Sequence, residues 1–213
     1  KTAAVGERLE ESQYSRGLAT GSGTDSTIVI ANRESEQYLT NAGKHSKLGE
    51  LIGRAVKAAV KEALYLQTGL GTEQQHSVFR RLSRFGLTRR GVYQQYLEAH
   101  PQEGMGRPRF EERLEKLEAD GLMVADASFL AHAIDQMDWK LLSVSETLAA
   151  AEQILGLMGA GEIPSREQIQ TEDEAVQAII SAYAQALVRK LTDADGSDRT
   201  SGNLAYGQAE SAV

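Results

Sequence analysis

The feature that most constrains this sequence is an uninterrupted helical pattern between Lys47 and Leu66. Apolar residues recur there at intervals of three and four, which places their side chains on one face of an α-helix. These apolar positions are Leu48, Leu51, Ile52, Ala55, Val56, Ala59, Val60, Ala63 and Leu64. Because Gly69 and Gly71 follow the pattern, we expect the helix to end there. The sequence therefore predicts one long amphipathic helix around which other elements can pack.

Most of the remaining sequence also predicts helices. Capping motifs and apolar spacing predict them over residues 2–12, 72–85, 88–99, 110–119, 127–138, 143–158 and 171–191. Leu122–Val124 fits either a strand or the beginning of the helix at 127–138. The β-branched run Thr27–Ala31 predicts a buried strand, but a single strand is too few for a stable sheet. The expected fold class is mostly α (α+β overall), with helices packed around the long helix and a small or incomplete β element.

Three regions follow from this organisation. Residues 1–70 form a motif-bearing segment with a glycine loop, a strand and the long helix, and residues 71–192 form a helical region. From Asp193 onwards the sequence is small and polar, so we expect residues 193–213 to be a disordered tail.

The composition excludes several classes of function. The 213 residues include no cysteine, which rules out disulfides, thiolate chemistry and iron–sulfur clusters. The four histidines form no pair with metal-ligand spacing, so we expect no preformed metal site. The net charge of −7 disfavours nucleic acid as a partner, and no apolar run is long enough for a membrane span or a signal peptide. We therefore expect a cytoplasmic protein with neither a nucleic-acid nor a membrane partner.

One basic stretch interrupts this acidic chain. Residues 74–97 hold five arginines (Arg80, Arg81, Arg84, Arg89 and Arg90) and no acidic residue. One interpretation is a solvated face, neutralised by the glutamates of 111–118 or by the acidic C-terminal helices. The other is a patch that attracts an anionic ligand or partner.

Two segments near the N-terminus carry candidate chemistry. Residues 17–26, GLATGSGTDS, form a tight glycine loop, but they lack the lysine of a P-loop and the third glycine of a dinucleotide fingerprint. Residues 41–50, NAGKHSKLGE, lie at the start of the long helix, where free N–H groups and the helix dipole favour an anion and a neutral His45. Gly49 and Gly53 interrupt a helix otherwise rich in good helix formers, so something must pack closely there, either another backbone or a flat ligand.

Each of these features also has a plain structural interpretation. A single histidine at a helix start, such as His45, is commonly a cap or a solvated side chain. Asp25 after a glycine turn commonly stabilises the turn itself.

The two segments together resemble the adenosylcobinamide amidohydrolase family of corrinoid salvage. The resemblance rests on YSRGLATGSGTDSTIVIAN at 14–32 and NAGKHSKLGELIGRAVKAAV at 41–60, and it is sharp over residues 1–65. The family shows ATGTGTD and GKHTKLGELI segments there, so Ser22 and Ser46 stand where threonine is expected. Family members carry further sequence before the glycine loop, so the chain resembles the C-terminal portion of a larger protein.

The resemblance implies an activity and a substrate. The family hydrolyses the amide between the aminopropanol arm and the corrinoid side chain of adenosylcobinamide, which gives adenosylcobyric acid and 1-aminopropan-2-ol. The corrinoid is then the substrate, and no cofactor is expected.

Amide hydrolysis requires an activated nucleophile, donors for the oxyanion and an acid for the leaving amine. We assign these roles to residues of the two motifs. His45 is the candidate base or acid, Asp25 would orient His45 or a water, and Lys44 would contact the oxyanion. Thr24 is a candidate covalent nucleophile. The expected substrate-binding residues are Thr20, Gly21, Ser22, Gly23, Asn41, Gly43, Ser46, Gly49 and Glu50.

Two other functions fit the same sequence. The chain could keep the fold as a corrinoid-binding or regulatory module without the chemistry, or it could be a helical interaction module that uses residues 72–192 as a partner surface. A homodimer that buries the helix at 47–66 is compatible with all three functions.

Overall fold

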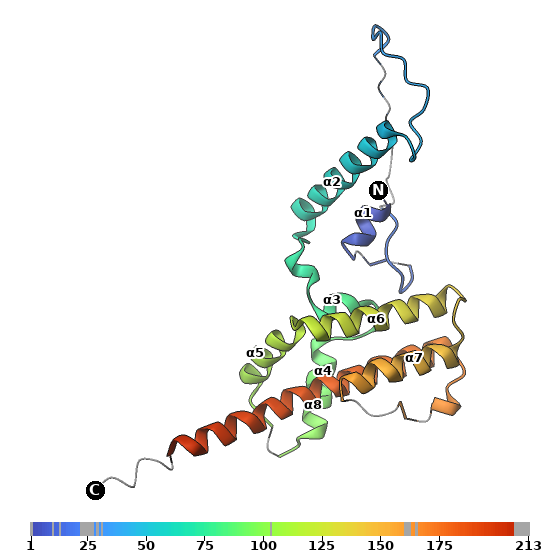
Figure 1. The fold of residues 1–213 in the computed structure, drawn as a ribbon. Helices are drawn as coiled ribbons and strands as arrows, with labels where there is room; N and C mark the ends of the chain where they lie inside the picture. The colour runs from blue at the N-terminus through green and yellow to red at the C-terminus, as the bar shows by residue number, and fades with distance from the viewer. Residues whose placement is uncertain are drawn as a thin grey trace. The chain divides into compact units, whose positions relative to one another are not determined.

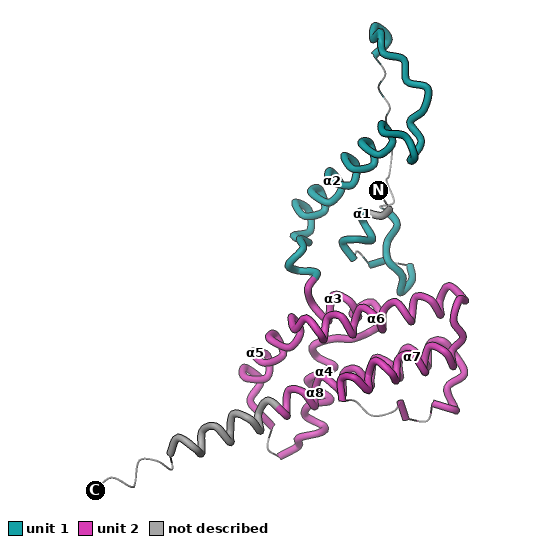
Figure 2. The backbone as a smooth tube through the Cα atoms, in the orientation of Figure 1, with its two compact units in different colours: residues 1–75 teal, residues 76–213 magenta. Residues whose placement is uncertain are grey.

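The computed structural model describes residues 2–9, 11–12, 14–21, 28, 30, 32–102, 104–159, 163–164 and 166–206, with the backbone alone at 194–206. The described chain is mostly helical and contains no strand, only an isolated antiparallel bridge between Glu11 and Leu18 (Figure 1). This confirms the predicted fold class of mostly α. The chain divides into two compact units, residues 1–75 and residues 76–213 (Figure 2).

Unit 1 contains the predicted long helix. Helix α2 spans Lys47–Thr68 and begins at the N-cap Ser46. It ends at Gly69, whose φ of 74° is left-handed and whose N–H donates to the carbonyl oxygen of Tyr65. Both the helix and its end at Gly69 are therefore confirmed.

The first helix, α1 (Thr2–Glu7), packs against α2 and ends before residue 12, to which the sequence extended it. Ala4 and Val5 of α1 are buried. Glu7, at the end of α1, forms ion pairs with both Lys57 and Lys61 of α2. Hydrogen bonds from these two lysines lower the pKa of Glu7 to about 2. A two-lysine clamp therefore joins the two helices of unit 1.

Within unit 1, the prediction that several helices pack around α2 is wrong. None of its residues is buried against the described part of the chain. Within the described residues of unit 1, the six-residue α1 is the α-helix that packs on it, and α1 is too short to cover the apolar face of a 22-residue helix.

The predicted buried strand at 27–31 is contradicted at its described positions. Ile28 and Ile30 lie outside any strand and are 84% and 91% exposed. No described strand lies beside them to exchange hydrogen bonds, and an isolated strand has no stability of its own. Thr27, Val29 and Ala31 lie outside the described residues.

Unit 2 is a helical bundle with its own core (Figure 1). Its elements are α3 (Val78–Leu82), α4 (Arg89–Ala99), α5 (Arg107–Glu118), α6 (Gly121–Asp138), α7 (Val144–Leu157) and α8 (Glu172–Tyr206), with short 3₁₀ turns at Glu73–Gln75 in unit 1 and at Ser83–Phe85 and Arg166–Gln168 in unit 2. Helix α6 packs against α3 and α7, and α8 packs against α4, α5, α6 and α7. The core therefore centres on α6 and α8, which contribute Leu130, Ile134, Ile179, Tyr183 and Leu187.

Several predicted helix boundaries in unit 2 are confirmed by their capping hydrogen bonds. Ser143 and Glu146 form a capping box at the start of α7, and Thr171 and Glu174 exchange the equivalent bonds at the start of α8. Asp120 caps α6, which begins at Gly121. Leu122–Val124 is therefore the beginning of a helix and not a strand.

Other boundaries differ from the prediction. Helix α5 begins at Arg107 rather than at residue 110, and α6 begins at Gly121 rather than at residue 127. The single helix expected over 72–85 is broken because Ser77 is extended, with φ −146° and ψ 136°, and a new helix starts at Val78. Helix α8 continues past Asp193 to Tyr206, where the sequence predicted a disordered tail. Extending an existing helix needs no new nucleus, so polar residues can continue it. Residues 207–213 lie outside the described residues.

Two arginines of the basic stretch, Arg84 and Arg89, form ion pairs within unit 2. Arg84 forms two hydrogen bonds to Asp135 of α6, at 2.6 and 2.7 Å, and both side chains are nearly buried. Arg89 pairs with Glu118 at 2.6 Å and with Glu111 at 3.8 Å. These contacts favour the neutralised face over the anion-binding patch.

The buried Arg84–Asp135 pair is expected to stabilise unit 2. Asp135→Ala removes the carboxylate that forms two hydrogen bonds with Arg84, whose side chain is 6% exposed, so we expect the free energy of unfolding to fall by about 3–5 kcal/mol. Urea unfolding followed by the fluorescence of Trp139, the single tryptophan, measures this change. Glu112→Ala, which removes the exposed pair with Lys116, is the control and should leave the midpoint nearly unchanged. Equal urea midpoints of unfolding for the two variants would show that the Arg84–Asp135 pair does not stabilise unit 2.

The two-lysine clamp on Glu7 predicts an acid-sensitive contact between α1 and α2. Because the pKa of Glu7 is lowered to about 2, its ion pairs contribute stability above the ordinary value of 4.5 and lose it as the pH falls toward 2. A carbon-13 NMR titration of the Glu7 carboxyl should give a midpoint near 2, with amide protection in α1 lost over the same range. In Glu7→Gln this protection should already be low at neutral pH. A midpoint near 4.5 would show that the clamp does not form.

Candidate functional site

The predicted site residues fall into two groups. Thr20 and Gly21 of the glycine loop are described, whereas Ser22, Gly23, Thr24 and Asp25 lie outside the described residues. The second group is fully described, and it consists of Asn41, Gly43, Lys44, His45, Ser46, Gly49 and Glu50.

The chain enters α2 through a turn closed by short hydrogen bonds. The side-chain oxygen Oδ1 of Asn41 accepts from the N–H of Gly43 at 2.7 Å. The carbonyl oxygen of Gly43 accepts from the N–H of Ser46 at 2.9 Å and from its hydroxyl at 2.8 Å. The Ser46 hydroxyl oxygen in turn accepts from the N–H of Gly49 at 3.0 Å. These bonds fix the conformation of residues 41–49.

Gly49 is required by this turn. A Cβ at Gly49 would lie 2.0 Å from the carbonyl oxygen of Gly43 and 2.7 Å from that of Ala42. No described heavy atom lies within 4 Å of a Cβ built at Gly53. The close neighbour expected from the two glycines is therefore another backbone at Gly49, while Gly53 faces open space. The contact through Ala42 could not be predicted from its side chain, because it uses only the backbone carbonyl.

Lys44 and His45 occupy the middle of this turn, and both side chains are exposed. Ser46 is the N-cap of α2, so the interpretation of His45 as the cap is wrong. Ser46 uses its hydroxyl both to donate and to accept, which gives it a structural role. Glu50 is paired with Lys47 at 2.8 Å and lies 3.6 Å from Arg54. The turn therefore presents Lys44 and His45 to solvent on a fixed backbone.

The start of α2 can attract a negative charge. The N–H groups of Lys47 and Leu48, in the first helical turn, have no acceptor within the helix. The positive end of the helix dipole lies at the same place, and Lys44 precedes the N-cap Ser46 by two residues. Together these groups can polarise a carbonyl oxygen or stabilise an oxyanion, while a histidine in the same turn can transfer protons.

The glycine loop is described only at its beginning. Residues 11–18 form a small turn, in which the N–H of Ser12 donates to the carbonyl oxygen of Gly17 at 3.0 Å. Thr20 is exposed and Gly21 is half-buried. None of the contacts given above for residues 41–50 involves Thr20 or Gly21. The contacts described for the second group are thus local to the start of α2.

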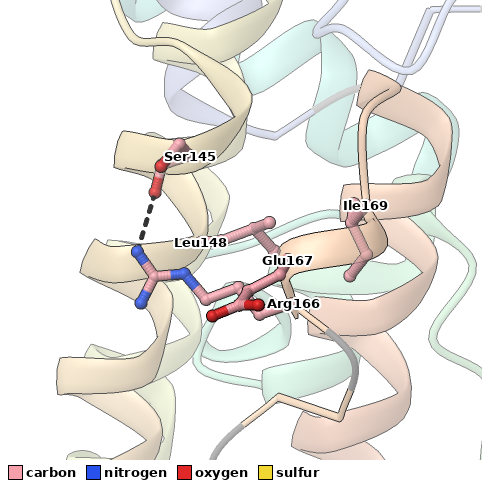
Figure 3. Close-up of a pocket in the computed structure, with 5 residues that line it drawn as sticks. All are labelled: Ser145, Leu148, Arg166, Glu167 and Ile169. Carbon is pink, nitrogen blue, oxygen red and sulfur yellow. Dashed lines mark hydrogen bonds between the residues drawn. The ribbon is translucent and has the colours of Figure 1, made fainter.

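A separate cavity of about 310 Å³ lies in unit 2, between α7 and the segment that leads into α8 (Figure 3). It is lined by Ser145, Leu148, Arg166, Glu167 and Ile169. Arg166 donates to the carbonyl oxygen of Ser145 at 3.4 Å and forms an ion pair with Glu152. Because its one cation is compensated and no predicted site residue lines it, we do not assign this cavity to the site.

Among the described residues, no three His, Asp or Glu side chains gather closely enough to hold a metal ion. No helix in the described part of the chain is both long and apolar enough to cross a membrane.

Comparison with protein families finds a similarity, which lies within unit 1. Residues 1–72 match the family model described as adenosylcobinamide amidohydrolase. This match confirms the resemblance drawn from the two sequence segments, and it ends just inside the boundary of unit 1. It covers about a third of the 213 residues and leaves unit 2 outside. Neither a curated protein nor a solved structure matches the chain.

The contrast between the two glycines of α2 gives a direct test of the turn. Gly49→Ala must displace the backbone of Ala42 and Gly43, so we expect it to destabilise the start of α2 by about 1–3 kcal/mol. Gly53→Ala meets open space and should stabilise the helix by about 1 kcal/mol through helix propensity. Hydrogen exchange of peptides from α2, measured by mass spectrometry, reports both changes. Equal effects of the two substitutions would contradict the close backbone contact.

Proposed function

We propose that unit 1 carries an adenosylcobinamide amidohydrolase site that acts in the salvage of cobalamin. The observation that most supports this proposal is that the family match and the turn at the start of α2 lie in the same segment. The residues that match the family model include the turn at 41–49, and this turn presents Lys44 and His45 at the start of α2. A lysine and a histidine beside free backbone donors are suited to amide hydrolysis.

In the proposed reaction, water attacks the carbonyl carbon of the aminopropanol amide. A carbon–oxygen bond forms, the carbon–nitrogen bond breaks, and the leaving amine takes a proton. The products are adenosylcobyric acid and 1-aminopropan-2-ol. His45 accepts the proton of the water and delivers one to the amine, and Lys44 stabilises the oxyanion together with the N–H groups of the α2 start and of the loop from Gly21 to Thr24. Asp25 orients His45 or the water.

A variant of this mechanism uses a covalent intermediate. In it the hydroxyl of Thr24 attacks the amide carbon, the amine leaves with a proton, and water then hydrolyses the ester. Asp25 and His45 would serve the same proton transfers in both steps. The two routes give the same products.

The substrate-binding residues separate into two roles in this proposal. The hydrogen bonds around Gly43 and Ser46 make Asn41, Gly43, Ser46 and Gly49 positioning residues that hold the turn. Thr20, Gly21, Ser22, Gly23 and Glu50 are proposed to contact the corrinoid. The corrinoid is the substrate and no other cofactor takes part, which fits a reaction in the cytoplasm without nucleic acid or membrane.

Replacing His45 tests the proposal. We expect His45→Ala to lower the rate of aminopropanol release from adenosylcobinamide by about 10²–10⁴-fold, because a general acid–base group is lost. The measurement is a mass-spectrometric assay of both products with the full chain. His76→Ala is the matched control, because His76 is also exposed but lies outside residues 1–72. Equal rates for the two variants and the parent chain would remove His45 from the mechanism.

The same assay separates catalysis from binding. A shift of the visible corrinoid spectrum on addition of cobinamide, with no product formed by the parent chain, would replace the amidohydrolase with a non-catalytic corrinoid-binding module. Release of aminopropanol at a rate above that of buffer supports the enzyme.

A further inference from the structure

The cavity of unit 2 has the size and the lining of a site for a small molecule (Figure 3). Its volume of about 310 Å³ lies at the lower end of the range for such sites. One part of its wall is apolar, because it is formed by the buried Leu148 and the half-buried Ile169. The other lining residues, Ser145, Arg166 and Glu167, are polar or charged. An apolar wall beside a few polar groups suits a small amphiphilic ligand.

Arg166 belongs to the frame of the cavity. Its guanidinium forms an ion pair with Glu152 of α7 and donates to the carbonyl oxygen of Ser145 at 3.4 Å. The other carboxylate oxygen of Glu152 accepts from the N–H of Ile163 at 3.3 Å, and Ile163 is buried. These contacts hold the segment before α8 against α7, and they compensate the positive charge of Arg166.

Two polar groups of the lining are left for a ligand. Within the described part of the chain, the carboxylate of Glu167 forms no ion pair and the hydroxyl of Ser145 forms no hydrogen bond. Both residues are exposed, so a molecule from solvent can reach them. Because Arg166 is paired with Glu152, Glu167 leaves the cavity with an excess negative charge. A cation is therefore favoured over an anion.

We propose that this cavity binds a small aliphatic amine in its protonated form. The ammonium group pairs with Glu167, and the carbon chain packs on Leu148 and Ile169. A hydroxyl on the chain forms a hydrogen bond with Ser145.

The identity of the amine rests on the proposed function. Hydrolysis in unit 1 releases 1-aminopropan-2-ol, which carries an ammonium group, a hydroxyl group and a short carbon chain. These three groups match Glu167, Ser145 and the apolar wall of the cavity. Unit 2 then binds the amine that the reaction sets free.

The test is an NMR titration of the nitrogen-15-labelled full chain with 1-aminopropan-2-ol at pH 7 and constant ionic strength. The amides of residues 145–148 and 166–169 should shift and saturate with a Kd on the order of 1–10 mM, because so small a ligand makes few contacts. Propane-1,2-diol has the same carbon skeleton with a hydroxyl in place of the ammonium group. It should bind at least fivefold more weakly.

Two substitutions test the individual contacts. Glu167→Gln keeps the size of the side chain but removes its charge, so the Kd for the amine should rise at least fivefold. Glu98→Gln makes the same change at an exposed position of α4 and is the control, with an unchanged Kd. Ser145→Ala should weaken the binding of 1-aminopropan-2-ol but not that of propan-1-amine, which lacks the hydroxyl. Equal effects on the two amines would contradict the contact with Ser145.

Three results overturn the proposal. They are no saturable shift in these amides up to about 50 mM amine, equal Kd values for the amine and the diol, and a Kd that Glu167→Gln leaves unchanged. The titration uses the amine alone, so its result does not depend on catalysis in unit 1. A chain that hydrolyses adenosylcobinamide but does not bind the amine contradicts only this inference. A chain that binds the amine but forms no product contradicts only the proposed function.

Discussion

The contact on which the candidate site depends is the approach of the Ala42–Gly43 backbone to the first turn of α2. It is possible only because residue 49 has no side chain, and it is held by the two hydrogen bonds that Gly43 receives from Ser46. The turn holds Lys44 and His45 at a helix end where the first backbone N–H groups have no acceptor within the helix. A site made in this way needs little tertiary support, which fits the sparse packing of unit 1.

The two units bury apolar surface very differently. Unit 2 holds a continuous core between α6, α8 and their neighbours, and buried polar contacts such as Arg84–Asp135 fit into it. Among the described residues of unit 1, Ala4 and Val5 are the buried apolar ones, and the unit relies on a cap, a glycine and the Glu7 ion pairs. Because the family match ends within unit 1, the matched segment and the main hydrophobic core lie in different parts of the chain.

Local features of the fold could be predicted from the sequence, and tertiary ones could not. The apolar spacing and Gly69 predicted α2, and the motifs at Ser143 and Thr171 predicted the starts of α7 and α8, because each depends on residues within one or two turns. Which helix lies at the centre of the packing depends on residues that are far apart in the sequence. The sequence placed α2 there, whereas the described core forms around α6 and α8. The two segments also located the candidate site, but the roles of Ser46 and Gly49 required the three-dimensional course of Ala42–Gly43.

The measurement that tests the central claim most directly is an NMR titration of the nitrogen-15-labelled full chain with cobinamide in its diamagnetic cobalt(III) form. A corrinoid site at the start of α2 predicts chemical-shift changes concentrated in the amides of residues 41–50 and of the glycine loop, with those of the α6–α8 core unmoved. Shifts concentrated in unit 2, or none at millimolar cobinamide, would contradict a corrinoid site at this helix start.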